Sequence, residues 1–186
     1  MDGSTGGSGG WEVERLKYPM GRFRARSGLT AADRQAHIED IAALPKDLRA
    51  VISGLSPEQL DAPYRPDGWT VRQVVHHLPD SHIHGYVRFK LAVTEIDPTV
   101  KTYDEAAWAE LTDAQGEEIE SSLLLLEALH RRWTPFLRSL HEEQFQRALL
   151  HPELGRVTLE TNLQLYAWHG RHHLAHITRL GERLGW

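Results

Sequence analysis

The stretch YAWHGRHHLAHITRL, residues Tyr166–Leu180, indicates both a fold class and a chemistry. Its apolar residues recur at the spacing of an amphipathic helix, and such a helix advances about 100° per residue. On this helix His169, His172, His173 and His176 fall within an arc of roughly 100°, which borders the apolar stripe. The stretch therefore predicts a packed helix that carries four imidazoles along one edge of its inward face.

Three more segments show the apolar spacing of helices. They cover about residues 30–53, 70–95 and 118–140, and the helix that contains the opening stretch covers about 159–184. The long connection between the second and third helices has room for a short helix at 104–110. We find no internal repeat and no convincing strand. Four amphipathic helices with one long crossover between the second and the third predict an all-α four-helix bundle.

Capping residues mark where the first two helices begin. Thr30 with Asp33, and Thr70 with Gln73, have the spacing of a capping box, in which the two side chains bond each other's backbone N–H groups. Pro79 removes one backbone hydrogen bond from the second helix. The helical pattern resumes after this proline, so we expect one kinked helix, whose kink could shift nearby side chains.

The remaining segments have less regular patterns. Residues 1–15 are expected to be a flexible, Gly/Ser-rich N-terminal segment, and residues 16–186 a single domain. Within residues 11–29 neither helical nor strand periodicity is visible, which predicts an extended segment on the domain surface. Residues 151–158 are turn-rich, and ELGRV at residues 153–157 could form a small hairpin tip.

Composition narrows the function. The 186-residue chain has a net charge of −5, which argues against nucleic acid as a partner because phosphate-binding surfaces are basic. It has no run of about 20 apolar residues, so no membrane span is expected. There is no Cys, which excludes disulfides and thiolate ligands. Without a secretory signal pattern, a cytoplasmic location is expected. The unusual feature is the content of 12 histidines.

Histidines four residues apart lie one above the other on a helix and can point at one metal ion. The last helix offers two such pairs, His169 with His173 and His172 with His176. A third imidazole would come from the second helix, where periodicity does not choose between His76 and His77. No pair has the Glu of the HExxH protease pattern. The other histidines are expected to be exposed or capping: His37, His82, His84, His130, His141 and His151.

The motifs YRPDGWTVRQVVHHLPDSHIHGYVRFKL, YDEAAW and LYAWHGRHHLAHI resemble the DinB/YfiT-like superfamily, in particular its YfiT branch. This resemblance implies a four-helix bundle and a homodimer. It also implies a metal site made of the histidine before the leucine of HHL and an HxxxH pair of the last helix. Carried over to this sequence, the ligands are His77, His172 and His176, with His169 and His173 framing the site or incidental.

Three functions are compatible with such a site. The resemblance favours a bacillithiol-type S-transferase, in which one divalent ion, Zn or Ni, activates a low-molecular-weight thiol that attacks a small-molecule substrate. The alternatives are a metal-dependent hydrolase that uses metal-bound water, and a non-catalytic, stress-related metal-binding module. The general base stays open, because Asp80 and His173 could serve or be surface groups. Arg72, Arg88 and Lys90 could meet an acidic thiol, although solvated-face charges are expected there.

Overall fold

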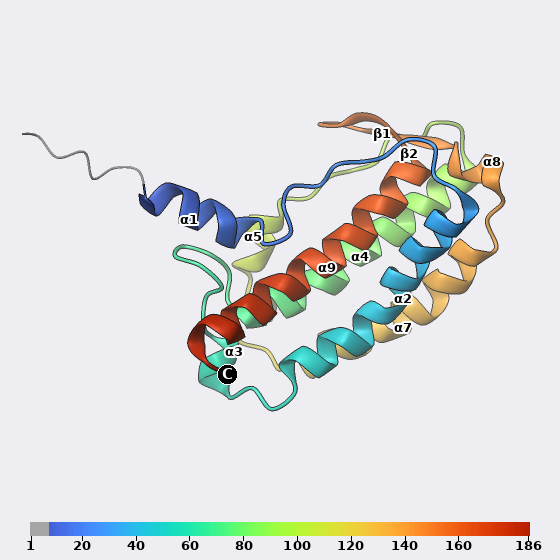
Figure 1. Ribbon diagram of the computed structural model, residues 1–186. Coiled ribbons are helices and arrows are strands. Elements are labelled where there is room, and N and C mark those ends of the chain that lie inside the picture. Colours follow the sequence, from blue (N-terminus) through green and yellow to red (C-terminus); the bar gives the residue numbers. More distant parts are fainter. Residues whose placement is uncertain (1–7) are drawn as a thin grey trace, which may run out of the picture.

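Four long helices lie side by side in the computed structural model, which describes residues 8–186 (Figure 1). They are α2 (Ala31–Ile52), α4 (Val71–Thr94), α7 (Glu120–Arg138) and α9 (Leu159–Leu184). Helix α2 packs against α7 and α9, and α4 packs against the same two helices. Helices α2 and α4 therefore lie on one diagonal of a four-helix bundle, and α7 and α9 lie on the other. The predicted fold class is confirmed.

The long connection between α4 and α7 follows the side of α4. It contains α5 (Glu105–Ala109) and α6 (Thr112–Gln115), and both short helices pack against α4. The connection returns the chain to the end of the bundle where α4 began, so α4 and α7 run in the same direction (Figure 1). The structure thus has the predicted crossover, and α5 is the short helix expected at 104–110.

The helix starts follow their capping signals. Thr30 and Thr70 accept hydrogen bonds from the backbone N–H groups of Asp33 and Gln73, and both capping boxes are complete. Helix α4 is continuous although Pro79 lies inside it. A minor helix, α3 (Pro57–Leu60), stands in the loop before α4.

The structure also contains a small antiparallel sheet that the sequence did not predict as strands. Strand β1 (Ala148–His151) pairs with β2 (Gly155–Thr158), after the short helix α8 (Glu142–Phe145). Gly155 has φ of 69°, a left-handed conformation that suits a short hairpin loop. Four-residue strands are too short for a period of two to stand out. Only the hairpin tip was visible in the sequence.

The N-terminal region differs from its prediction. Helix α1 (Ser8–Lys17) covers residues predicted to be flexible or extended, whereas residues 1–7 lie outside the described part of the chain. This exposed helix has local support, because the Arg15 guanidinium lies 5.5 Å from the centre of the Trp11 ring. From residue 18 to 29 the chain is non-helical, as predicted, and crosses the surface of the bundle (Figure 1).

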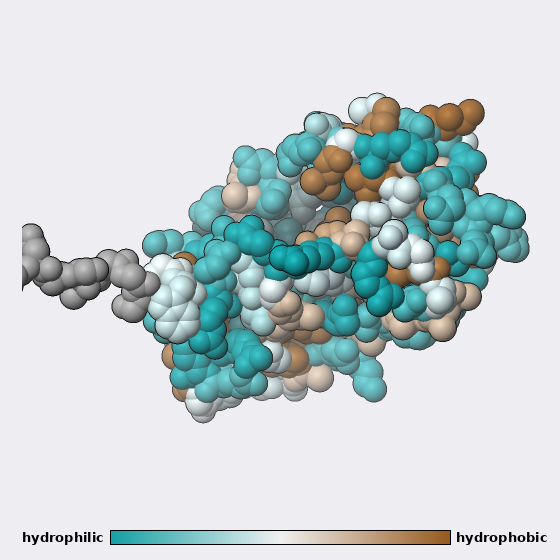
Figure 2. All heavy atoms as spheres, turned by 45° about the horizontal axis from the view of Figure 1, so that its top comes forward, coloured by the Kyte–Doolittle hydropathy of each residue, from teal (hydrophilic) through white to brown (hydrophobic). Residues whose placement is uncertain are grey.

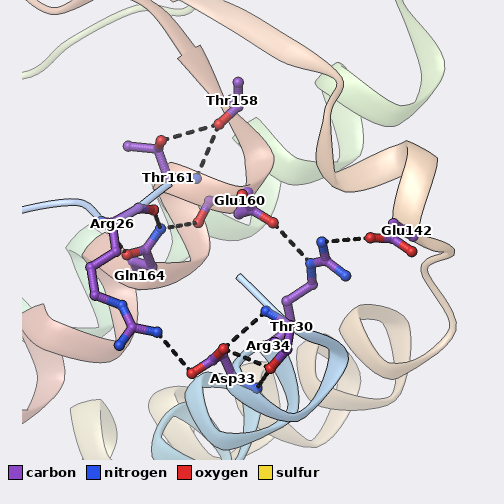
Figure 3. Close-up of polar contacts among 9 residues, drawn as sticks. All are labelled: Arg26, Thr30, Asp33, Arg34, Glu142, Thr158, Glu160, Thr161 and Gln164. Carbon is purple, nitrogen blue, oxygen red and sulfur yellow. Dashed lines mark hydrogen bonds and ion pairs between the residues drawn. The ribbon is translucent and has the colours of Figure 1, made fainter. Parts of the chain in front are cut away.

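Polar contacts fasten this crossing segment and join the beginnings of α2 and α9 (Figure 3). The side-chain amide of Gln164 accepts a hydrogen bond from the backbone N–H of Arg26 at 2.8 Å and donates one to its carbonyl at 2.9 Å. The Arg34 guanidinium, buried between the helices, donates to Glu160 at 2.9 Å and to Glu142 at 3.1 Å. These contacts set how α9 is placed against the rest of the bundle.

Two clusters of apolar side chains form the core. One surrounds Trp133 and Phe89 near the hairpin, and the other surrounds Leu48, Leu78 and Leu126 toward the C-terminal end of α9. Most of the buried histidines lie between or beside these clusters. Within residues 8–186, no helix has both the length and the apolar character needed to cross a membrane.

Candidate metal centre

Three imidazoles from two helices meet on one side of the bundle. One ring nitrogen from each of His77, His169 and His173 lies within 4.8 Å of the others. His77 comes from α4, and the other two are one turn apart on α9. The Nε2 atoms of His77 and His169 are 3.2 Å apart. Helix packing therefore brings the HxxxH pair His169/His173 against the single histidine of α4.

The donor set of this triad fits a transition-metal ion. Two nitrogens at about 2.0–2.1 Å from a tetrahedral ion are separated by about 3.3 Å, which is close to the distance between His77 and His169. The ring of His173 makes no hydrogen bond to any described residue, and its Nδ1 is buried without a partner. All three donors are imidazoles, which suit Zn, Ni, Cu or Fe.

Burial keeps the triad neutral. Desolvation lowers the pKa of His77 to about 4. Desolvation, reinforced by the neighbouring histidines, lowers the pKa values of His169 and His173 well below the usual 6.5. A neutral imidazole offers a lone pair to a metal ion without first losing a proton.

The second HxxxH pair, His172 and His176, lies beside this triad. The His172 ring stacks on Trp168, with 4.3 Å between the ring centres. The His176 ring stacks on Tyr64 at 3.9 Å, and its Nε2 donates to the carbonyl oxygen of Lys17 at 3.1 Å. Both rings thus face the N-terminal segment and the loop before α4.

The structure therefore brings a different pair to His77 from the one named in the sequence analysis. His77 lies in the triad together with His169 and His173, whereas His172 and His176, named with His77 in the sequence analysis, lie outside it. The angular positions of the histidines around the α9 axis already favoured His169 and His173 as the inward-facing pair. Around the α9 axis, His173 and His169 lie about 20° and 60° from the buried Tyr166, whereas the other two lie about 80° and 120° away.

Other histidines also differ from expectation. His82 and His130 were expected to be exposed or capping, but they are 0% and 2% exposed and lie in the core. His76 faces α7, where its Nδ1 is 2.7 Å from Ser122 Oγ, so it is separate from the triad. Pattern alone does not reveal a buried polar residue, because its environment comes from other helices.

A cavity of about 680 Å³ opens above the triad. Figure 2 shows the molecule from the side that bears the hairpin and α5, where its surface is hollowed. Aromatic rings form much of the wall, from Tyr18, Tyr64, Trp69, Tyr103, Tyr166 and Trp168. The ring of Trp69 lies against His77, with 4.7 Å between the centres. A small molecule could therefore reach the triad in a largely aromatic pocket.

The charged residues named in the sequence analysis are divided between the cavity and other surfaces. Arg88 borders the cavity, and its buried Nε has no hydrogen-bond partner among the described residues. Arg72 instead donates to Asp61 at 2.8 Å, and Lys90 is exposed. Burial and the charge of Asp113 on α6 raise the pKa of Asp80 to about 6.

A family model described as the DinB superfamily matches residues 40–177, most of the chain. The chain belongs to the DinB superfamily. The four-helix bundle of the chain agrees with the bundles of the similar solved structures.

Curated relatives and solved structures extend the comparison. A Bacillus subtilis protein named "Putative metal-dependent hydrolase YfiT" is 46% identical over 172 residues, covering 92% of this chain and 97% of the relative. A Bacillus cereus protein with a similar name is 49% identical over 171 residues, covering 92% and 98%. The solved structure of YfiT, described as "a probable metal-dependent hydrolase with an unusual four-helix bundle topology", matches with a TM-score of 0.90 and covers 92% and 99%. The four-helix bundle protein TT2238, at 19% identity and a TM-score of 0.51, shares the fold.

Proposed function

We propose that this chain is a metal-dependent enzyme in which His77, His169 and His173 hold one divalent ion, zinc or nickel. The observation that carries the proposal is the meeting of three neutral imidazoles within 4.8 Å at the base of a cavity. A divalent ion with three protein ligands keeps a position open, where it lowers the pKa of a bound water or thiol. The names of the relatives support metal dependence.

We further propose that the nucleophile is a low-molecular-weight thiol. No ring of the triad is hydrogen-bonded to a carboxylate within residues 8–186. Ester or amide hydrolysis needs a group that takes a proton from water and passes one to the leaving group. A thiol depends less on such a proton-accepting group, because its ordinary pKa of about 8.5 is far closer to neutrality than the pKa of water, about 15.7.

The reaction is then a substitution at an electrophilic carbon. The thiol sulfur forms a bond to that carbon while the bond to the leaving group breaks, and the thiol proton departs with the leaving group. The aromatic wall excludes water from the reacting atoms, and Trp69 restricts the orientation of His77 by packing against its ring. The chain supplies no sulfur nucleophile of its own because it has no Cys.

The charges around the cavity suit a thiol that carries both an acid and an amine. Cationic and anionic side chains share the rim: Lys17, Asp67, Arg65, Arg88, Glu105 and Glu153. The guanidinium of Arg88, which lines the cavity, would pair with a carboxylate of the ligand. An Arg88→Leu variant is expected to raise the KM for such a thiol and to leave metal content unchanged.

Hydrolysis is the second candidate, since the relatives' names specify it. The deciding experiment uses untagged protein loaded with Zn²⁺, Ni²⁺ or Co²⁺. Cysteine and an aromatic chloro electrophile are supplied, and loss of thiol and release of chloride are followed; 4-nitrophenyl acetate is tested in parallel. Thiol consumption that requires metal, together with a sulfur-to-cobalt charge-transfer band, supports the transferase.

Other outcomes of this experiment would favour a different function. Metal-dependent ester cleavage without thiol consumption favours the hydrolase. Metal binding without turnover of either substrate class favours the non-catalytic module considered from the sequence. Failure to bind metal removes the basis of all three functions. Homodimer formation and a cytoplasmic location stay predictions.

A further inference from the structure

A row of hydrogen bonds runs from the triad through the core to the backbone of α2. His169 Nδ1 lies 3.2 Å from His82 Nε2, and His82 Nδ1 lies 2.9 Å from His130 Nε2. The row ends where His130 Nδ1 meets the carbonyl oxygen of Ile41 at 2.6 Å. Three helices other than α9 thus contribute to the environment of a single candidate ligand.

The carbonyl at the end determines the direction of every bond in the row. A carbonyl oxygen only accepts, so His130 carries its proton on Nδ1. In a neutral ring the other nitrogen, Nε2, is then an acceptor, and it receives the proton of His82 Nδ1. By the same rule His82 Nε2 accepts from His169 Nδ1. The proton of His169 is therefore on Nδ1, and its Nε2 keeps a free lone pair.

The rings are neutral because of where they lie. His82 is fully buried and His130 is 2% exposed, so a charge on either would lose its hydration. Neither ring is hydrogen-bonded to a carboxylate within the described part of the chain. The geometry alone gives the direction once the rings are neutral.

We propose that His82 and His130 are positioning residues that fix the tautomer of His169, so that its Nε2 is held unprotonated toward the metal centre. Metal-binding histidines commonly donate their second N–H to a carboxylate or a carbonyl. Here the carbonyl oxygen of Ile41 does not contact the ligand His169 directly. Its effect is passed on through the imidazoles of His130 and His82. This inference depends on the metal centre and is independent of the nucleophile that it activates.

The row of hydrogen bonds also predicts which ring nitrogens of His77 and His169 carry a proton when no metal is bound. Since His169 Nε2 is an acceptor, the facing His77 Nε2, 3.2 Å away, carries the proton between them. Metal binding requires both nitrogens to be unprotonated. His77 must therefore move its proton to Nδ1 or lose it, whereas His169, His82 and His130 keep their tautomers.

Long-range ¹H–¹⁵N correlation spectra of ¹⁵N-histidine-labelled full-length protein test this directly. Without metal, we expect Nδ1–H signals for His169, His82 and His130 and an Nε2–H signal for His77. After addition of Zn²⁺ only His77 should change its pattern of protonated nitrogens. An Nε2–H signal from His169 in the metal-free wild type would overturn the proposal, even if the protein proved to be an active enzyme.

Variants of His130 test the effect on affinity. His130→Phe removes the nitrogen that accepts the proton of His82 Nδ1. His82 can then carry its proton on Nε2 instead. Nδ1 of His169 must then accept this proton, so His169 carries its own proton on Nε2, the nitrogen that faces the metal. We expect Zn²⁺ affinity, measured by competition with a chelator, to fall by about 10–100-fold. His130→Gln places an amide oxygen near the lost acceptor and should recover most of the affinity.

Thr134→Val is the matched control, because the Thr134 hydroxyl donates to the backbone carbonyl of His130 and not to the row. It disturbs the same turn of α7 while leaving the imidazoles in place. Equal loss of affinity in Thr134→Val and His130→Phe would assign the effect to general destabilisation and overturn the proposal. An unchanged His169 tautomer in His130→Phe would overturn it as well.

Discussion

Two pairs of histidines on α9 have the same sequence spacing and different surroundings. His169 and His173 face α4 and meet His77, whereas His172 and His176 face aromatic rings and the backbone of Lys17. Each pair lies one helical turn apart, and each is neutral through burial. What separates them is a rotation of about 60° around the helix axis.

HxxxH spacing lets two imidazoles of one helix point at the same ion, but the spacing alone does not identify a metal site. A pair becomes a site when a neighbouring helix supplies a further ligand at the right height. The second pair instead supports the wall of the cavity, where His176 connects the N-terminal segment to α9.

Removal of one member from each pair should give the largest contrast. We expect His173→Ala to weaken Zn²⁺ binding by more than about 100-fold, because loss of a ligand should exceed the 10–100-fold cost of losing an outer partner. His172→Ala should keep one tightly bound ion per chain. Metal content by mass spectrometry after dialysis measures both.

The reverse result would assign the site to the pair named from the sequence. If His172→Ala lost the ion and His173→Ala kept it, the rings of α9 would bind metal in an arrangement other than the one described. Circular dichroism of both variants checks that each keeps its helical content.

Acid should destabilise the metal-free protein, since both pairs and four other buried histidines must take up protons. The buried histidines with lowered pKa values are His76, His77, His82, His130, His169, His172, His173 and His176. Below the unfolded value of 6.5 the unfolded chain binds more protons than the native state, so stability is present above 6.5 and falls as the pH drops toward about 4.

Each such histidine contributes up to about 1.4 kcal/mol per pH unit in that window. Asp80, with its raised pKa, acts in the opposite direction and offsets part of the effect. Urea unfolding at about pH 7.5, 6.5 and 5.5 measures the slope. A free energy of unfolding that stayed constant over this range would contradict neutral burial of the two pairs.

The close approach of α9 to α4 on the triad side depends on Gly85. A methyl group there would lie 2.5 Å from Tyr166 Cζ and 2.8 Å from Trp133 Cη2. We expect Gly85→Ala to lower the free energy of unfolding by about 1–3 kcal/mol through overpacking. Gly116→Ala is a control, because the added group would meet one atom, Thr112 O, at an ordinary 3.8 Å. Equal effects of the two variants would contradict this account.

The smallest effect is expected from His176→Phe. The new ring can keep the stacking on Tyr64 but loses the hydrogen bond to Lys17 O, which costs about 1 kcal/mol. Metal affinity should stay at the wild-type value. A large loss of affinity would show that the second pair contributes to the metal centre.

Much of the fold could be predicted because its signals are local. The capping boxes at Thr30 and Thr70 depend on residues three positions apart, and the structure confirms both. The two strands of the hairpin and helix α1 were missed for a related reason: short or exposed elements bury few side chains and leave weak periodicity. Helix α4 continues through Pro79, as the helical pattern on both sides of this proline predicted.

The sequence by itself determined the helical class, the crossover, the content of imidazole ligands and the absence of any thiol. Family resemblance directed attention to His77. Only the tertiary structure decided which pair meets His77 and that His82 and His130 lie buried behind His169. The physical reason is that a helix determines the angles between its own side chains, whereas the neighbour that each side chain faces depends on how the helices pack.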